Sequence, residues 1–225
     1  MSTLILARLL HRAARAVALA GVDQRQMLTQ WPPMSSQSYR FLRWLLWLVL
    51  AVPGAWSLSR WALMTETYGY GHAIGDSGDW AAWLLLVTLA VTPLRLAFRK
   101  ARWAQWLARH RRDLGVASFA YALGHTSIYL WNKADIARVL AEAADMQYLT
   151  GWLALALFIP LAITSNDASM RRLKRGWKRL HRLVYPAAVL TFVHWALTAF
   201  DPMTAYLHIG ILAAIWIARA LLTRR

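Results

Sequence analysis

The stretch WKRLHRLVY at residues 177–185 joins a strongly basic segment directly to an apolar one. His181 stands at the junction, and His194 follows inside the apolar run. Basic residues at the end of a long apolar run are typical of the cytoplasmic end of a membrane span. An ionisable side chain inside such a span is costly and needs a partner. The stretch therefore predicts a membrane helix whose histidines have a binding partner.

The composition extends this interpretation to the whole chain. Hydrophobic residues make up 59% of its 225 residues, above the roughly 45–50% of soluble domains. The net charge is +16, and the basic residues cluster between apolar runs, which indicates topology signals and contact with anionic lipid, not nucleic-acid binding. The chain has no cysteine, which excludes disulfides, cysteine-ligated iron–sulfur clusters and thiolate zinc sites.

Six apolar runs are long enough to be considered as membrane helices, so we expect an all-α, polytopic bundle. The loops at residues 99–112 and 165–182 are strongly basic, whereas those at 65–79 and 132–147 carry most of the acidic residues. By the positive-inside rule both termini are then cytoplasmic. The six runs cover residues 41–64, 80–98, 114–131, 148–164, 183–200 and 203–222.

We divide the chain into two parts. Residues 1–38 are polar and basic, with arginines at helical spacing opposite leucines, and are expected to be a cytoplasmic extension that forms an amphipathic helix at the membrane surface. Residues 39–225 hold the six apolar runs and form the transmembrane domain.

The histidines share a spacing that points to a metal. His194 follows His181 at the same interval at which His125 follows Arg112. Both runs cross from the inside outward, so both histidines reach a level about 20 Å from the cytoplasmic edge. Two imidazoles at one level of neighbouring parallel helices can ligate one heme iron from opposite faces. Structural and proton-relay roles for the same histidines stay open at this point.

A second set of candidates lies at the inner level, where His181 has no histidine opposite. Arg111 and Arg112 stand there instead, and Arg111 shares nearly one helix face with His125. Arginine is well shaped to bind a heme propionate or a flavin phosphate. Tyr185 could hydrogen-bond a propionate or could be an ordinary interfacial tyrosine. An ideal helix would place His181 and His194 about 140° apart, unless Pro186 between them turns the chain.

These motifs resemble a known family. The segments RRDLG at 111–115 and YALGH at 121–125, the stretch at 177–185, and His194 are similar to the heme-binding membrane subunit of the protein-methionine-sulfoxide reductase system, the MsrQ or YedZ family. That family belongs to the ferric-reductase-like transmembrane group. The resemblance covers roughly residues 75–200. Its motif of Leu-His-Arg-Leu-Val-Tyr, followed by a histidine at the position of His194, is fairly specific.

The resemblance implies a multi-pass b-type cytochrome of the bacterial inner membrane. It assigns heme iron, in one or two hemes, to His125, His181 and His194, and it adds FMN as a candidate cofactor. It implies electrons from a cytoplasmic flavin reductase, or from quinol, and their delivery to a periplasmic molybdopterin enzyme that reduces methionine sulfoxide. The chain would then be an electron-transfer subunit and not the catalytic one.

Two rivals remain. A ferric- or quinone-linked reductase would keep the cytochrome and change its partner, and a membrane transporter or scaffold would have no redox role. The chain departs from the family at residues 146–148, which read Met-Gln-Tyr in place of Arg-Pro-Tyr. It also lacks a glycine-rich dinucleotide fingerprint, so a separate protein or quinol must supply the electrons.

Overall fold

The computed structural model describes residues 36–64, 66–199 and 201–224. The expected amphipathic helix falls within residues 1–35 and so lies outside the described residues. The chain divides into two compact units, residues 1–44 and 45–225. The described part of the first unit is the start of helix α3 (Ser36–Leu63). The second unit holds the candidate site.

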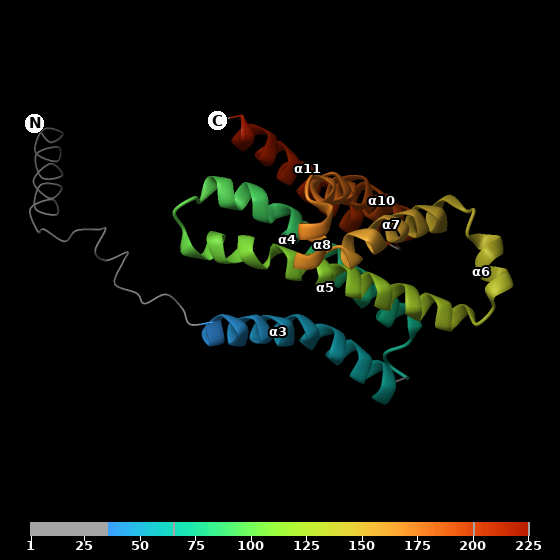
Figure 1. The fold of residues 1–225 in the computed structure, drawn as a ribbon. Coiled ribbons are helices and arrows are strands. Elements are labelled where there is room, and N and C mark those ends of the chain that lie inside the picture. The colour runs from blue at the N-terminus through green and yellow to red at the C-terminus, as the bar shows by residue number, and fades with distance from the viewer. Residues whose placement is uncertain (1–35, 65, 200, 225) are drawn as a thin grey trace, which may run out of the picture. The chain divides into compact units, whose positions relative to one another are not determined.

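The described part of the chain is helical throughout and contains no strand (Figure 1). A three-residue 3-10 turn, η1 (His181–Leu183), leads into α10. The helices that follow α3 are α4 (Tyr70–Ala97), α5 (Arg102–Lys133), α6 (Ile136–Glu142), α7 (Met146–Ile163), α8 (Asp167–Leu173), α9 (Arg175–Leu180), α10 (Val184–Thr198) and α11 (Pro202–Thr223).

Helix pairs build the core of the second unit. Helix α4 packs along α5, α7 packs along α10, and α11 packs against α4 and α10. Figure 1 shows α4 and α5 as the two arms of one hairpin. The apolar side chains buried between α4, α10 and α11 are Ala82, Leu85, Leu86, Leu89, Ala188, Phe192 and Leu212. This packing fixes α5 and α10, the two helices that carry the deep histidines.

Four helices of the described part are long and apolar enough to cross a membrane, at residues 40–63, 70–97, 146–163 and 203–223. Many large apolar side chains on them are exposed, as a surface in contact with lipid requires. The chain is therefore a helical membrane protein. Helix α5 is basic in its first half and α10 has only 15 residues, so neither is among the four.

The start of α4 differs from the prediction. The sequence predicts an outer loop at residues 65–79, but the helix begins at Tyr70 and runs through three glycines. Glycine is a poor helix former, so tertiary contact must supply the stability. That contact is present, because Ser77 and the carbonyl of Ile74 both lie against His125 of α5.

Helix α3 receives a side chain from α5 beside Pro53 and Gly54. The Tyr121 hydroxyl donates to the Leu50 carbonyl and accepts from the Gly54 N–H, at 2.8 Å each. A regular helix would pair these two backbone groups with each other. The hydroxyl thus enters the backbone ladder of α3, a recognised cause of helix bending.

Candidate heme site

His125 is held by the backbone of a neighbouring helix. Its Nδ1 lies 2.9 Å from the carbonyl oxygen of Ile74 in α4 and 3.5 Å from the Ser77 hydroxyl. A carbonyl can only accept, so Nδ1 carries the proton and Nε2 keeps its lone pair. Metal-ligating histidines have this arrangement, with the far nitrogen donating to a carbonyl or carboxylate.

His194 repeats the arrangement on another helix pair. Its Nδ1 lies 2.6 Å from the carbonyl oxygen of Gln147 in α7. Nδ1 is therefore the donor here as well, and Nε2 again keeps the lone pair. The two histidines come from different helices, α5 and α10, yet they share one tautomer and one kind of partner.

A glycine lies against each of these imidazoles. Gly78 is one helical turn after Ile74, and a Cβ at Gly78 would stand 3.2 Å from His125 Nδ1. Gly151 is one turn after Gln147, and a Cβ there would stand 2.9 Å from His194 Nδ1 and Cε1. A side chain at either position would push the ring away from the carbonyl. The two glycines thus give the imidazoles the room to reach the backbone.

The two rings then meet. Their centroids are 6.2 Å apart and their planes are at 88°. Two imidazoles that bind one metal ion at about 2 Å each have ring centroids roughly 6 Å apart. Among the described residues no three His, Cys, Asp or Glu side chains gather as a metal site would require. Heme would suit such a pair, because it needs only two ligands from the protein, and His125 and His194 would hold it.

His181 is set differently. The Thr164 hydroxyl donates to the Pro160 carbonyl at 2.6 Å and lies 3.0 Å from His181 Nε2. The hydroxyl proton is used, so Nε2 donates to it and Nδ1 keeps the lone pair. Burial first, and the Arg111 charge second, lower the pKa of His181, while its hydrogen bond to Thr164 acts the other way. The imidazole is therefore neutral at pH 7 and able to bind a metal.

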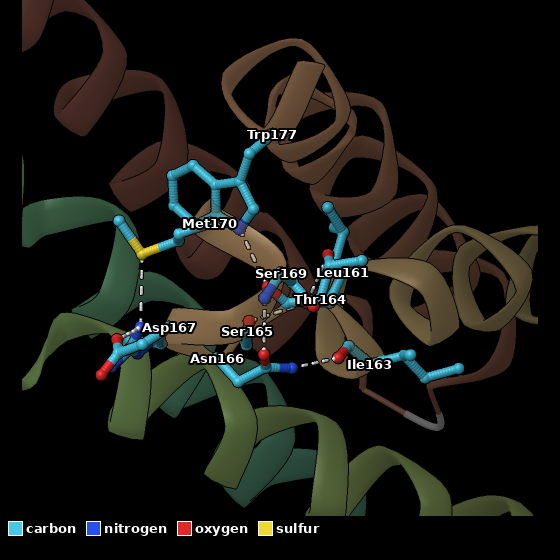
Figure 2. Close-up of polar contacts among 10 residues, drawn as sticks. Leu161, Ile163, Thr164, Ser165, Asn166, Asp167, Ser169, Met170 and Trp177 are labelled. Carbon is cyan, nitrogen blue, oxygen red and sulfur yellow. Dashed lines mark hydrogen bonds and ion pairs between the residues drawn. The ribbon is translucent and has the colours of Figure 1, made fainter. Parts of the chain in front are cut away.

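An indole covers the same imidazole. The Trp177 ring stacks on His181, with centroids 3.9 Å apart and planes at 26°. Its Nε1 donates to the Thr164 carbonyl at 2.9 Å, a contact that Figure 2 shows. In the same view Asn166 caps α8 by accepting from the Ser169 N–H. Thr164 at the end of α7 and Trp177 of α9 thus hold His181 from two sides.

The angular separation expected for one ideal helix does not apply to His181 and His194, because a 3-10 turn interrupts the helix between them. The turn η1 ends α9 at His181, and α10 begins only at Val184. Pro186 lies in the first turn of α10, where a missing N–H costs nothing. The break lets His181 and His194 face independently.

The other residues predicted from the sequence to bind a cofactor lie in two different places. Arg111 donates from Nε to the Thr88 carbonyl at 3.1 Å and lies within electrostatic range of Tyr185. Arg112 instead donates to Asp167 at 2.6 Å and contacts the Met170 sulfur at 3.3 Å. Arg111 and Tyr185 are thus brought together, whereas Arg112 lies in an ion pair with α8.

Sequence reasoning missed three residues of this region. Gly78 and Gly151 face the deep histidines, and Arg219 of α11 donates to the Tyr185 hydroxyl. A glycine inside an apolar helix was the only signal for the first two. For Arg219 the available signal is a charge within an apolar run, and nothing in the spacing links it to Tyr185.

Comparison with known proteins assigns the chain to a family. Residues 77–192, just over half of the chain, match the family described as ferric reductase like transmembrane component. The chain belongs to this family. The match to the ferric reductase like transmembrane component contains His125, His181 and the two glycines, and it ends just before His194. No solved structure matches.

Within the ferric-reductase-like family the chain is similar to proteins named protein-methionine-sulfoxide reductase heme-binding subunit MsrQ, which confirms the resemblance predicted from the sequence. That of Xanthomonas campestris pv. campestris (strain B100) is 43% identical over 143 residues, or 62% of this chain and 64% of the relative. That of Herminiimonas arsenicoxydans is 41% identical over 124 residues, or 53% and 55%. The chain thus spans less than two thirds of these curated relatives.

Proposed function

We propose that this protein is a membrane b-type cytochrome that carries electrons outward across the bilayer to a partner enzyme. One observation carries the proposal: the His125 and His194 rings stand 6.2 Å apart with each Nδ1 bonded to a main-chain carbonyl. In this arrangement both Nε2 lone pairs are free for the iron of one heme. Bound there, heme would supply a reversible one-electron carrier.

A heme held by His125 and His194 together would supply electron transfer and not chemistry on a substrate. In this proposal His125 and His194 hold the group, and the carbonyls of Ile74 and Gln147 orient the two imidazoles. His181, with its different tautomer, serves an inner cofactor, which is a second heme or FMN.

We further propose six spans with both termini in the cytoplasm. Helices α5 and α10 join the four apolar helices as the third and fifth spans. The basic turns at residues 99–112 and 165–182 then face inward, and the turn that contains α6 faces outward. His181 lies at the cytoplasmic edge in this topology, and the deep pair lies in the outer half of a bacterial inner membrane.

The proposed partners follow from the name of the relatives and from the proposed outward transfer of electrons. The MsrQ relatives are heme-binding subunits of a protein-methionine-sulfoxide reductase. We propose that this chain likewise serves a periplasmic molybdopterin enzyme that reduces methionine sulfoxide. A cytoplasmic flavin reductase, or quinol, would supply the electrons, because the chain has no dinucleotide fingerprint of its own.

The test is spectroscopic. Purified protein expressed with ample heme should give a b-type pyridine hemochrome and a dithionite-reduced difference spectrum. His125→Ala and His194→Ala should each lose the outer heme, whereas His72→Ala, which removes an exposed histidine, should not. His181→Ala should keep the outer heme and slow its reduction by the donor. A colourless wild-type protein would overturn the proposal and favour a transporter or scaffold.

A second reading keeps the cytochrome and changes its acceptor. The description of the matched family refers to ferric reductase, so ferric iron is one alternative acceptor. A quinone is the other alternative acceptor. Reduced protein that is oxidised by ferric chelates, but not by a methionine-sulfoxide reductase with its substrate, would favour this alternative.

A further inference from the structure

Four side chains that can donate hydrogen bonds gather near His181. Arg219 of α11 donates to the Tyr185 hydroxyl of α10, and its guanidinium carbon lies 5.1 Å from the centre of the Tyr185 ring. Trp216, one turn earlier on α11, packs against the same ring at 6.1 Å. Arg111 of α5 lies within electrostatic range of Tyr185 and of the charged Arg219. Three helices therefore direct donors to one place.

These donors outnumber their acceptors. Arg111 uses Nε on the Thr88 carbonyl, and no carboxylate of the described residues pairs with Arg111 or Arg219. The Nε1–H of Trp216 is buried and has no hydrogen-bond partner within the described part of the chain. Buried donors are normally satisfied, so an orphaned indole N–H on a ring that packs against Tyr185, together with two guanidiniums that lack a carboxylate, indicates an absent acceptor.

Charge leads to the same conclusion. Arg111 and Arg219 repel each other, and both are partly withdrawn from water. Such a pair is unfavourable unless an anion lies between or beside the two groups. A planar guanidinium binds carboxylate and phosphate oxygens through paired hydrogen bonds. The missing acceptor is therefore an anionic oxygen group.

We propose that Arg219 and Trp216 complete a binding site for an anionic oxygen group of the inner cofactor, a propionate carboxylate or a flavin phosphate, together with Arg111 and Tyr185. The inference rests on the proposed function, because it needs a cofactor beside His181. It adds α11, which lies beyond the residues 77–192 that the family match covers, to the elements that hold that cofactor.

Arg219→Gln tests the site, with Arg224→Gln as the matched control because Arg224 is an exposed arginine at the end of the same helix. Loss of one charged hydrogen bond should weaken binding roughly 10-fold or more. If the anion is a flavin phosphate, flavin per protein falls in Arg219→Gln while heme content stays the same. If it is a propionate, heme is retained and the reduction potential of the inner heme falls, because a cation that stabilised the reduced form is gone.

Two further, more conservative variants distinguish a loss of binding from misfolding. Arg219→Lys keeps the charge but loses the planar fork, so it should show the same change to a smaller degree. Trp216→Phe keeps an aromatic ring and removes the N–H, so it should weaken binding without a change in charge.

Unchanged flavin content and unchanged heme potentials in Arg219→Gln and Trp216→Phe would overturn the inference. Loss of a co-purified phospholipid with both cofactors intact would also overturn it, since the anion would then be a lipid headgroup. Failure of the proposed function gives a different result, because the wild-type protein itself would then lack heme.

Discussion

At the scale of single residues, the placement of the two deep histidines depends on two positions that have no side chain. Gly78 and Gly151 have no side chain, and so His125 and His194 can reach the carbonyls one turn earlier on α4 and α7. The matched spacing in the sequence correctly predicts that the two imidazoles meet. The glycines could not be predicted, because which residue of α4 or α7 faces a histidine depends on the register between helices.

Gly151→Ala should therefore displace His194. The added Cβ would stand 2.9 Å from the ring, and overpacking of this kind costs about 1–3 kcal/mol. We expect heme content to fall strongly, and to fall less in Gly78→Ala, where the nearest approach is 3.2 Å. Pyridine hemochrome per protein measures both.

Gly210→Ala is the control for this pair, because a Cβ at that position of α11 meets nothing within 4 Å. It should keep its heme and gain roughly 0.5–1 kcal/mol of helix stability. Equal heme content in all three alanine variants would show that the glycines do not position the imidazoles.

At the scale of elements, the apolar runs predict the helices well and their ends less well. The first run covers residues 41–64, and α3 ends at Leu63. Helix α5 extends from Arg102 to Lys133, well beyond the expected 114–131. Hydropathy marks the apolar part of a helix, whereas α5 also includes the basic residues that precede its apolar run. The break at η1 gave no sequence signal beyond Pro186.

The contact of Tyr121 with the backbone of α3 leads to a testable prediction about this helix. Tyr121→Phe removes both hydrogen bonds to the backbone of α3 and should destabilise the protein by roughly 1–2 kcal/mol. Amide exchange in the segment around Gly54 should rise more than exchange in α10. The measurements are thermal unfolding in detergent and hydrogen exchange read by mass spectrometry.

Tyr206→Phe is the matched control, because Tyr206 is 61% exposed on α11. It should leave both stability and exchange unchanged. If the exchange of α3 were the same in the two variants, the Tyr121 hydroxyl would not be what holds this part of α3.

At the scale of the whole molecule, the proposed topology rests on the distribution of charge. The net charge of +16 is concentrated in the turns proposed to face the cytoplasm. The sequence predicts this distribution fully, since it needs only the order of charges and apolar runs. It could not predict which helices pack together, for instance α11 against α4, because that depends on side-chain fit between distant segments.

The absence of native cysteine makes the topology easy to test. Single cysteines placed in exposed positions should react alternately from the two sides of the membrane. A membrane-impermeant maleimide should label intact spheroplasts at Glu66→Cys, Ala141→Cys and Met203→Cys. It should label Gln37→Cys, Lys100→Cys, Ala168→Cys and Arg224→Cys only after lysis. Two neighbouring positions that react from the same side would remove a span from the proposed six.

The partners of the two deep histidines are main-chain oxygens, which no substitution can delete. The side chains of residues 74 and 147 can therefore change while each imidazole keeps its orientation and its proton. The glycine one turn further along each helix is constrained by its contact with the ring. A search for the supporting groups of this site should therefore look for small residues, and not for a recurring acid or amide.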